Sequence, residues 1–239
     1  MSAADLRRAL SVVDLTRLER PDDAAAIDAL AAKAVTDAGR VAAICVYPEW
    51  IERVLGPGVP VAAVANFPAG ADDADLAARE AAQGVGAGAT EIDVVVPWRT
   101  FAAGDGDAIA RVVSATRAAI GPGIGLKAIL ETGSLESAAR VRAAGEQALA
   151  AGADFLKTST GKVGAGASLA ATRVLLEVVR DAGHGGVKAS GGVRTAERAT
   201  EYLALADEVM GAGWATPERF RIGASSLVDD LLGRLGEDS

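Results

Sequence analysis

Short apolar runs rich in Val, Ile and Ala alternate with longer amphipathic stretches along almost the whole chain. Brief apolar runs are typical of strands buried on both faces, and apolar residues spaced three and four apart are typical of helices. The pattern predicts eight strands, at Val12–Leu15, Val41–Val46, Val61–Ala65, Glu91–Val96, Leu126–Leu130, Asp154–Lys157, Val187–Ser190 and Arg219–Ile222. It predicts helices between most of them, at Asp22–Ala38, Asp72–Gly84, Phe101–Ile120, Ser134–Ala151, Ser168–Ala182 and Thr195–Leu205.

Capping residues mark several of these helix ends. Ser134 and Ser168 open helical stretches, where a serine hydroxyl can accept a hydrogen bond from a free backbone N–H group. Gly39, Gly152 and Gly183 follow such stretches and are placed where a C′ glycine ends a helix. The caps therefore support the helix boundaries that the periodicity predicts.

Strands that alternate with helices of this length favour right-handed crossovers and a parallel sheet. Eight such units predict a closed (β/α)8 TIM barrel, a fold of about 250 residues, and the chain has 239. No linker or low-complexity stretch divides it, so we expect a single α/β domain over residues 1–239. The pattern leaves Ala206–Glu218 open as a loop or a broken helix.

The amino-acid composition limits the cellular compartment and the classes of partner that we expect. The net charge of −8 and the absence of a basic cluster argue against a nucleic-acid partner. A single cysteine, Cys45, excludes an internal disulfide and fits a reducing compartment. The N-terminus lacks an apolar signal core, and no stretch of about 18 apolar residues could cross a membrane. We therefore expect a cytoplasmic protein.

Lysine is scarce in this chain, which carries nineteen arginines and five lysines, namely Lys33, Lys127, Lys157, Lys162 and Lys188. An arginine-rich composition also fits a GC-rich genome, so the positions of the lysines matter more than their number. Lys157 ends the sixth predicted strand and Lys188 lies on the seventh, and glycine-rich sequence follows both. Neighbouring strands would bring the two ammonium groups to one barrel mouth.

Two ammonium groups held close together resist joint ionisation, and burial acts in the same direction. Lowering one lysine pKa from about 10.4 to about 7 costs about 4.6 kcal/mol, which burial and a like charge can supply together. A neutral lysine can attack an aldehyde or ketone and form a Schiff base. The spacing alone leaves a second interpretation open, in which Lys157 and Lys188 only bind phosphate or pair with carboxylates.

Acidic residues lie on the fourth predicted strand, where Glu91 and Asp93 share one face. Acids in an apolar parallel strand are costly unless paired, so we expect both to point into the barrel. Asp93 is nearer the carboxyl end and is the better general acid or base. Glu91 lies deeper, and we expect it to pair with Lys127. Asp14 ends the first strand and could either bind a substrate hydroxyl or cap the next turn.

Phosphate often binds a TIM barrel at the loops after strands seven and eight. Strand seven ends in Ser190-Gly191-Gly192-Val193-Arg194, and strand eight ends in Gly223-Ala224-Ser225-Ser226, which opens the final helix. Glycines let backbone N–H groups approach an anion, and a helix N-terminus adds partial positive charge. Arg194 or Lys162 could supply a full charge, so the sequence predicts phosphate binding here.

The single cysteine and the single histidine give weaker evidence of a catalytic role. Cys45 is more often a packed hydrophobe than a nucleophile, and whether it contacts substrate is left open. His184, the single histidine, is expected in a solvated loop. No His, Cys or Asp cluster has metal-ligand spacing, and neither nucleotide-binding glycine motif occurs. We therefore expect no metal and no cofactor.

Together these segments resemble deoxyribose-phosphate aldolase, a class I (Schiff-base) aldolase family built on the (β/α)8 barrel. The resemblance extends over almost the whole chain, from Asp14-Leu15-Thr16 to Gly223-Ala224-Ser225-Ser226. Its most specific segments are Lys157-Thr158-Ser159-Thr160-Gly161-Lys162 and Lys188-Ala189-Ser190-Gly191-Gly192-Val193-Arg194. Shorter matching segments are Ile44-Cys45-Val46-Tyr47-Pro48, Asn66-Phe67-Pro68, Glu91-Ile92-Asp93 and Leu126-Lys127.

The resemblance implies a role for each matching residue. It implies that Lys157 forms the Schiff base, that Lys188 lowers the pKa of Lys157 and joins the proton relay, and that Asp93 donates and accepts protons with an ordered water. The phosphate contacts it implies are Gly161, Lys162, Gly191, Gly192, Val193, Arg194, Gly223, Ser225 and Ser226, and Asp14 and Cys45 are further candidates for substrate contact. Some members carry a C-terminal tyrosine that reaches the site. This sequence ends Gly236-Glu237-Asp238-Ser239, so proton exchange at the enamine is expected to be slower or differently assisted.

The expected reaction is reversible cleavage of 2-deoxy-D-ribose 5-phosphate to D-glyceraldehyde 3-phosphate and acetaldehyde, a step of deoxyribonucleotide catabolism. The expected partners are these small molecules, and a homodimer or larger homo-oligomer is expected, although the sequence does not set the oligomeric state. Three alternatives remain: a Schiff-base aldolase with a ketone donor such as dihydroxyacetone phosphate, a non-catalytic sugar-phosphate-binding barrel, and a phosphosugar isomerase that uses a carboxylate base alone.

Overall fold

The computed structural model describes residues 1–237, and the chain forms a closed barrel of eight parallel strands. The hydrogen-bonded order is β1, β10, β9, β8, β7, β6, β5, β4, with β4 closing onto β1. The barrel strands are β1 Val13–Thr16, β4 Ala43–Val46, β5 Val61–Ala65, β6 Glu91–Val95, β7 Gly125–Ile129, β8 Phe155–Lys157, β9 Gly186–Ser190 and β10 Phe220–Ala224. All eight predicted strands and the (β/α)8 fold are confirmed.

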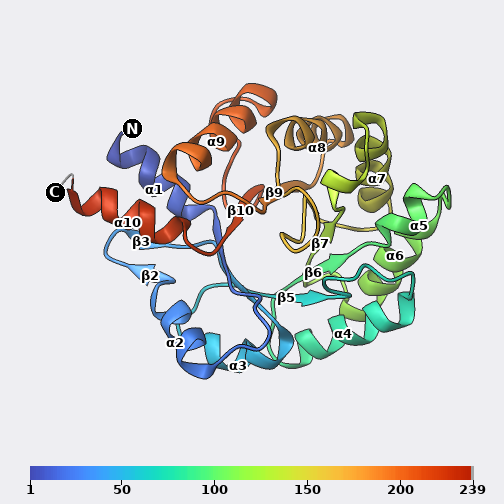
Figure 1. The fold of residues 1–239 in the computed structure, drawn as a ribbon, viewed down its shortest axis with the longest axis horizontal. Helices are drawn as coiled ribbons and strands as arrows, with labels where there is room; N and C mark the ends of the chain where they lie inside the picture. Colours follow the sequence, from blue (N-terminus) through green and yellow to red (C-terminus); the bar gives the residue numbers. More distant parts are fainter. Residues whose placement is uncertain (238–239) are drawn as a thin grey trace.

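Helices surround the barrel, and α1 and α10 lie side by side near the two ends of the chain (Figure 1). The helices are α1 Ala3–Ser11, α2 Ala24–Ala32, α3 Ile51–Val54, α4 Ala74–Gly86, α5 Trp98–Ala102, α6 Ala108–Ile120, α7 Ala138–Ala150, α8 Leu169–Ala182, α9 Ala196–Met210 and α10 Leu227–Glu237, with short 3-10 turns η1 Pro48–Trp50 and η2 Thr132–Ser134. Within residues 1–237 no helix is both long and apolar enough to cross a membrane.

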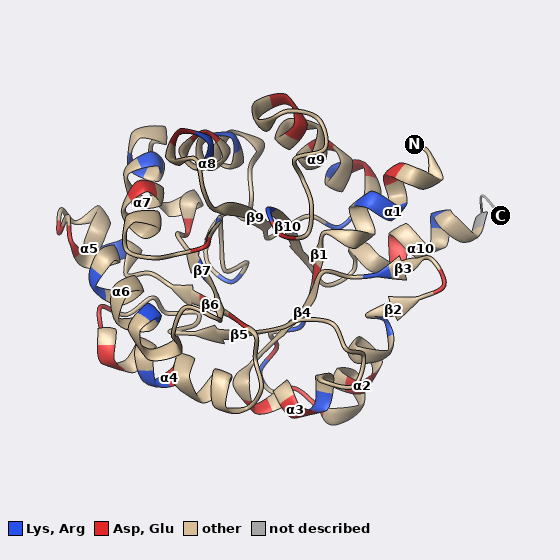
Figure 2. Ribbon diagram, turned by 180° about the vertical axis from the view of Figure 1, so that it is seen from behind, with Lys and Arg blue, Asp and Glu red and all other residues tan. Residues whose placement is uncertain are grey.

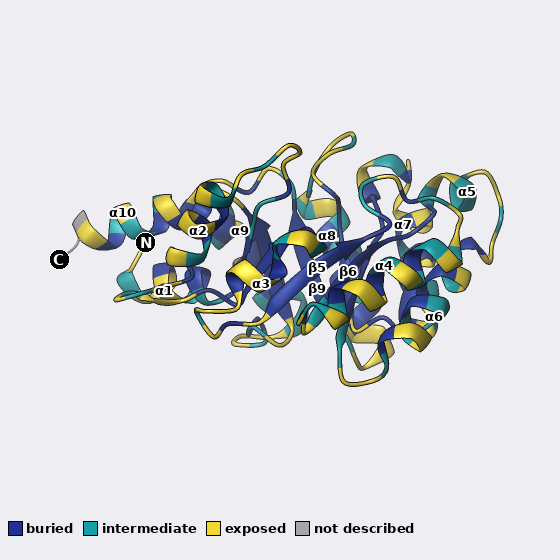
Figure 3. Cartoon of the chain, turned by 90° about the horizontal axis from the view of Figure 1, so that it is seen from below, coloured by how far each residue is buried: buried dark blue, intermediate teal, exposed yellow. Residues whose placement is uncertain are grey.

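The strands alternate between two environments. Ile92 and Val94 of β6 belong to the large apolar cluster that the barrel shares with the helices, whereas Asp93 between them is fully buried on the other face. The strands are buried almost throughout, and the helices expose their outer faces (Figure 3). A small apolar group, made of Leu18, Cys45, Tyr47, Ala62 and Val64, packs separately from the large cluster.

Three predicted helix boundaries were wrong at short-range turns. The helix expected over Asp22–Ala38 stops at Ala32, because Val35–Thr36 (β2) pairs antiparallel with Gly39–Arg40 (β3). Gly39 therefore lies in a hairpin, with φ of 136°, and ends no helix.

The helix expected over Phe101–Ile120 is two helices, α5 and α6, separated by a turn in which Gly104 takes φ of 109°. The N-cap of α7 is Ser137, whose hydroxyl accepts from the Arg140 N–H group, and the predicted Ser134 ends η2 instead. The serine three residues later caps the helix because Glu136 turns the chain with φ of 62°.

Other capping predictions are confirmed. The Ser168 hydroxyl accepts from the Ala171 N–H group, and Gly183 ends α8 in the left-handed conformation. Gly152 follows the C-cap Ala151 of α7 with positive φ. The open segment Ala206–Glu218 divides in two, because α9 continues to Met210 and a loop follows.

Candidate active site

Two lysines meet at one carboxylate inside the barrel. Lys157 ends β8, Lys188 lies on β9, and the two are register partners. Their Nζ atoms lie 2.8 Å and 2.7 Å from Oδ2 of Asp93, which β6 supplies. All three side chains are buried. The expectation that the two ammonium groups gather at one place is confirmed.

The other oxygen of Asp93 binds a third lysine. Lys127 Nζ lies 2.9 Å from Asp93 Oδ1 and also contacts Glu91 Oε2. The Glu91–Lys127 pair predicted from the sequence is therefore confirmed. One carboxylate thus joins three lysines from three neighbouring strands.

An arginine that the sequence did not single out closes the set. Arg221 of β10 donates to Asp14 Oδ1 at 2.6 Å and to Glu91 Oε1 at 2.9 Å. Asp14 Oδ2 in turn lies 2.6 Å from Lys188 Nζ. We call these residues the ion-pair network; they are Asp14, Glu91, Asp93, Lys127, Lys157, Lys188 and Arg221. Figure 2 shows such charged positions on the barrel strands as well as on the helices.

The network holds four cationic groups against three carboxylates. An unbalanced charge in a buried site is unfavourable, and loss of one proton from a lysine removes it. Arginine does not lose its proton near neutral pH, so the proton must come from one of the three lysines.

The surroundings separate the lysines by pKa. Burial lowers the pKa of Lys157, Asp93 opposes this effect, and Lys188 adds to it, so the net shift is downward. Burial acts on Lys188 too, but the carboxylates of Asp14 and Asp93 raise its pKa well above the usual value. Asp93 and Glu91 outweigh burial at Lys127 and raise its pKa. Lys157 is therefore the lysine that gives up a proton most easily. This direction agrees with the prediction that the pKa of one of the two lysines falls.

The pKa values of two network carboxylates, Asp93 and Asp14, are lowered. Burial by itself raises the pKa of Asp93, but Lys127, Lys157 and Lys188 outweigh it and hold that pKa well below the usual value. Burial also disfavours the charged form of Asp14, and Lys188 and Arg221 again reverse the effect and lower its pKa.

Replacing Glu91 by glutamine is expected to destabilise the protein, because it leaves Lys127 and Arg221 without a shared anion; the Glu91 side chain is only 13% exposed. Breaking a buried pair costs about 3 kcal/mol, which lowers the Tm of a chain of this length by about 6–12 °C. Thermal unfolding measures the shift. Glu208→Gln, which breaks the exposed pair with Arg173, is the control and should change Tm by about 2 °C or less. Equal melting of the Glu91→Gln variant and the unaltered protein would contradict the pairing.

A cavity of about 240 Å³ opens at the carboxyl ends of the strands. It is lined by Thr16, Leu18, Glu19, Lys157, Thr160, Gly161, Lys162, Ser190, Gly191, Gly192, Val193, Arg194, Gly223, Ala224 and Ser225. Thr16, Lys157, Ser190 and Ala224 are the last residues of their strands, which is where TIM barrels carry their active sites. Of the network residues, all of which are described, Lys157 is the one that lines this cavity.

Glycines let the loops after β8 and β9 approach each other closely beside this cavity. A Cβ atom on Gly191 would lie 2.9 Å from the Cα atom of Gly166, and Gly191 has φ of 92°. The Ala167 N–H group donates to the carbonyl oxygens of Ser190 and Gly191. The two loops are thereby fixed to one another, and both line the cavity.

Gly223 makes room for a network lysine. A Cβ atom at this position would lie 2.1 Å from Ser190 Oγ and 3.0 Å from Lys188 Cε. Any larger residue would displace Lys188 or Ser190. This glycine therefore contributes to packing inside the barrel as well as to the cavity wall.

The predicted phosphate-binding residues gather at the cavity, with one exception. Gly161, Lys162 and Arg194 line it together with the other predicted loop residues, whereas Ser226 lines a neighbouring cavity of about 420 Å³. Ser225 lines both cavities.

The remaining candidates lie below the cavity. Asp14 is bound by Lys188 and Arg221, so it does not cap the next turn. Cys45 is fully buried, with Sγ 3.9 Å from Asp93 Oδ2, and burial raises the pKa of its thiol. Contact of either residue with a substrate stays a prediction. The C-terminal expectation rests in part on residues 238–239, which lie outside the described residues.

Sequence reasoning missed Glu131, which follows β7 and is fully buried. It takes a left-handed conformation with φ of 52°, a strained geometry for a residue with a Cβ atom. Its Oε2 accepts from the Thr160 N–H group at 3.1 Å and from the Thr160 hydroxyl at 2.7 Å. Glu131 thus fixes the segment between Lys157 and Lys162. Its place at the carboxyl end of a strand was the available signal.

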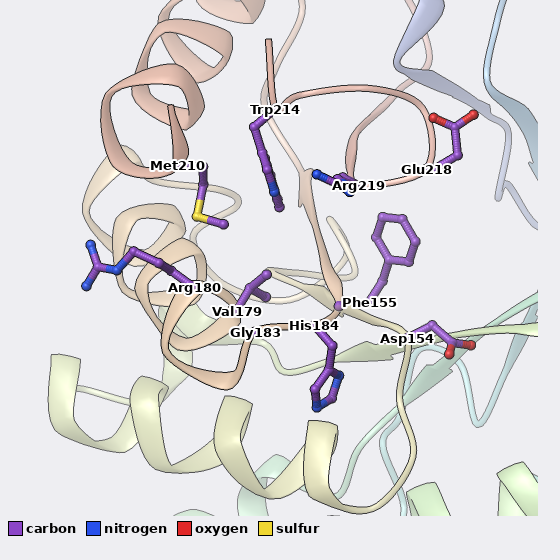
Figure 4. A pocket seen from close by; sticks show the side chains of 11 residues that line it. Asp154, Phe155, Val179, Arg180, Gly183, His184, Met210, Trp214, Glu218 and Arg219 are labelled. Atoms are coloured by element: carbon purple, nitrogen blue, oxygen red, sulfur yellow. The ribbon is translucent and has the colours of Figure 1, made fainter. Parts of the chain in front are cut away.

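A larger cavity, of about 540 Å³, lies at the opposite end of the barrel. Asp154 and Arg219 precede β8 and β10 there, and Trp214 and Met210 lie beside Val179 of α8 (Figure 4). None of the network residues lines it. Conserved chemistry in TIM barrels lies at the other face, so size alone does not make this cavity the active site. His184 lines it and is exposed, as predicted.

In the described part of the chain, no three His, Cys, Asp or Glu side chains gather in a way that could hold a metal ion. The polar groups at the cavity are the amine of Lys157, the buried carboxylate of Asp93 behind it and two loops rich in glycine. This arrangement can bind a phosphorylated carbonyl compound and attack it with an amine.

Comparison with known proteins places the chain in one family. The family model described as DeoC/LacD family aldolase matches residues 8–232. The deoxyribose phosphate aldolase of Aeropyrum pernix, described as tetrameric, is 27% identical with a TM-score of 0.79, and the match covers 100% of both chains. A protein of Coccidioides immitis, provisionally assigned as a deoxyribose-phosphate aldolase, is 29% identical with a TM-score of 0.84, covering 96% of this chain and 86% of that one. A Toxoplasma gondii protein with the same provisional assignment is 23% identical with a TM-score of 0.91, covering 99% and 98%, and supports the fold alone.

Proposed function

Because the chain belongs to the DeoC/LacD family of aldolases, we propose that it reversibly cleaves 2-deoxy-D-ribose 5-phosphate to D-glyceraldehyde 3-phosphate and acetaldehyde through a Schiff base on Lys157. One observation carries the assignment of the nucleophile. Lys157 is the network lysine that lines the cavity and also the one whose pKa is lowered. The names of the Aeropyrum pernix and Coccidioides immitis proteins support the choice of substrate.

In the condensation direction, the neutral amine of Lys157 attacks the carbonyl carbon of acetaldehyde. The carbinolamine loses water to give a protonated imine, and loss of a proton from the methyl carbon gives an enamine. The enamine carbon then bonds to the aldehyde carbon of glyceraldehyde 3-phosphate, whose oxygen takes up a proton. Addition of water to the new imine releases the sugar phosphate and restores the amine.

Asp93 and Lys188 are proposed to move these protons. Asp93 Oδ2 contacts both lysine Nζ atoms, so the ammonium group of Lys188 can give a proton through this carboxylate to the reacting groups at Lys157 and then take it back. Lys188 also keeps Asp93 ionised and lies too deep to line the cavity. Lys188 therefore suits the relay, and Lys157 suits the bond to substrate.

The loops after β8, β9 and β10 are proposed to hold the phosphate. Lys162 and Arg194 supply charge at the cavity, and Gly191, Gly192 and Ser225 line it beside them. Glycine N–H groups and the N-terminal end of α10 add partial positive charge.

Replacing Arg194 by alanine is expected to raise KM for the phosphorylated sugar about tenfold and to leave KM for unphosphorylated 2-deoxy-D-ribose nearly unchanged. Arg194 is exposed at the cavity, and a charge-assisted hydrogen bond is worth about 1.5 kcal/mol or more. Steady-state kinetics with both sugars measure the difference. Arg173→Ala, at an exposed pair on α8, is the control. An equal rise in the KM values of both sugars would show that Arg194 does not bind the phosphate group.

The proposed reaction is tested by incubating the protein with 2-deoxy-D-ribose 5-phosphate and assaying acetaldehyde and glyceraldehyde 3-phosphate separately. Both products should form in equal amounts. Release of dihydroxyacetone phosphate from a ketose phosphate would favour the ketone-donor aldolase instead. An isomerised sugar would favour the isomerase, and saturable binding without product would favour the non-catalytic barrel.

We further propose that the protein acts in the cytoplasm, in deoxyribonucleotide catabolism, as one domain and as a homo-oligomer. The single buried cysteine supports a reducing compartment. The closed barrel supports a single domain, and the Aeropyrum pernix protein, described as tetrameric, supports self-association. Sedimentation of the purified protein measures the oligomeric state.

A further inference from the structure

A carboxylate stands at the proposed phosphate site. Glu19, in the loop after β1, lines the cavity together with Lys162 and Arg194. Its Oε1 lies 3.1 Å from Lys162 Nζ, although 143 positions separate the two residues in the sequence. A negative side chain is unexpected where an anion is to bind, since like charges repel.

The contact between Glu19 and Lys162 has a local cause. The two arginines beside Glu19 in the same loop are taken by other carboxylates, Arg17 by Asp22 and Arg20 by Glu49. Glu19 is thereby left to pair across the cavity mouth. The Glu19 side chain is 62% exposed and that of Lys162 is 32% exposed, so this pair is weak and can be exchanged.

We propose that Glu19 is a specificity-determining residue that competes with the substrate phosphate for Lys162 and so reduces the preference for phosphorylated over unphosphorylated sugars. The proposal rests on the proposed function, because it assumes that a phosphate binds at this cavity. A phosphate dianion must take Lys162 from Glu19 and then tolerate the carboxylate beside it. A sugar with a terminal hydroxyl meets no such repulsion and can donate a hydrogen bond to Glu19.

The position of Glu19 extends its effect beyond the phosphate. Glu19, Thr16 and Ser225 also line the neighbouring cavity of about 420 Å³. Glu19 therefore lies at the boundary between the two cavities. The substrate class that we expect to benefit is uncharged hydroxyaldehydes and their deoxy-sugar products.

The first experiment compares the unaltered protein, Glu19→Gln and Glu208→Gln at fixed ionic strength. Glu208 is the matched control, because it is 63% exposed, pairs with Arg173 on the outer surface and removes the same charge. Glu19→Gln should lower KM for 2-deoxy-D-ribose 5-phosphate about threefold to tenfold, an expectation of the size of one screened charge. KM for 2-deoxy-D-ribose should stay the same or rise, and the change should appear in KM rather than kcat. Values equal to those of Glu208→Gln would overturn the proposal.

A second readout needs no turnover. Binding of inorganic phosphate, followed by calorimetry, should tighten about threefold to tenfold in Glu19→Gln and stay unchanged in Glu208→Gln. In a Lys162→Gln background, the Glu19→Gln change should have a clearly smaller effect, since the competition for that lysine is gone and the repulsion between Glu19 and phosphate alone remains. An effect of equal size in that background would assign it to general charge and overturn the proposal. Absence of aldolase products with unaltered protein would instead count against the proposed function.

Discussion

Replacement of Lys157 by alanine is expected to abolish carbon–carbon bond cleavage, with kcat falling more than about ten-thousandfold, as is usual when a catalytic nucleophile is removed. The amine is the group that forms the covalent bond, and the other network lysines do not line the cavity. The fold should persist, because the loss leaves three cations facing three carboxylates. Initial rates of acetaldehyde release measure the effect.

Two comparisons make this result specific. Lys33→Ala removes an exposed lysine that pairs with Asp229 and should leave kcat unchanged. Phosphate binding should also survive in Lys157→Ala, because Lys162 and the glycine loops remain. Acetaldehyde release by Lys157→Ala within about a hundredfold of the unaltered protein would support another nucleophile, and isomerisation of the sugar phosphate by the variant would support a carboxylate-only isomerase.

Asp93→Asn is expected to give the second-largest loss, a fall in kcat of about a hundredfold to ten-thousandfold, in the range of general acid–base catalysis. The neutral amide cannot accept the proton that Asp93 exchanges with Lys157 and Lys188. It also leaves four cationic groups facing two carboxylates, so the variant should melt at a lower temperature. Steady-state kinetics and thermal unfolding measure the two effects separately.

Glu91→Gln separates proton transfer from charge balance. The substitution removes one carboxylate from the same network. The Glu91 side chain pairs with Lys127 and Arg221 and not with Lys157 or Lys188. If Asp93 acts as the acid and base, Asp93→Asn should lose far more activity than Glu91→Gln at temperatures where both are folded. Equal losses would mean that charge balance alone accounts for the role of Asp93.

The strands and the lysine pair could be predicted because their signals are local. Val- and Ile-rich runs specify buried parallel strands, and Lys157 and Lys188 fall on neighbouring runs. The period of two placed Asp93 and Glu91 on one face, and the structure confirms it. Repetition of one unit around a closed barrel leaves few alternative arrangements.

The network could be predicted only in part, because it depends on register between strands. Lys157, Lys188 and Arg221 lie in one row across β8, β9 and β10, and no single strand reveals that row. The sequence therefore did not single out Arg221. It predicted that Asp14 binds a substrate hydroxyl or caps a turn, and did not predict the ion pair between Asp14 and Arg221. The position of Ser226 could not be predicted from the sequence either, because the turn at the start of α10 decides which cavity this residue lines.

The predicted helix ends were wrong where short-range turns interrupted the helical pattern of apolar residues. The hairpin from Val35 to Arg40 and the turn at Gly104 both interrupt stretches whose apolar spacing continues. Backbone pairing and positive φ values decide such boundaries, and apolar spacing does not report them.

Reductive trapping tests the central claim most directly. The protein is incubated with acetaldehyde and borohydride, digested, and mapped by mass spectrometry. The account predicts a single ethyl group on the peptide that contains Lys157, with Lys127, Lys162 and Lys188 unmodified. An ethyl group on another lysine, or a protein that stays unmodified while it releases acetaldehyde from the sugar phosphate, would contradict it.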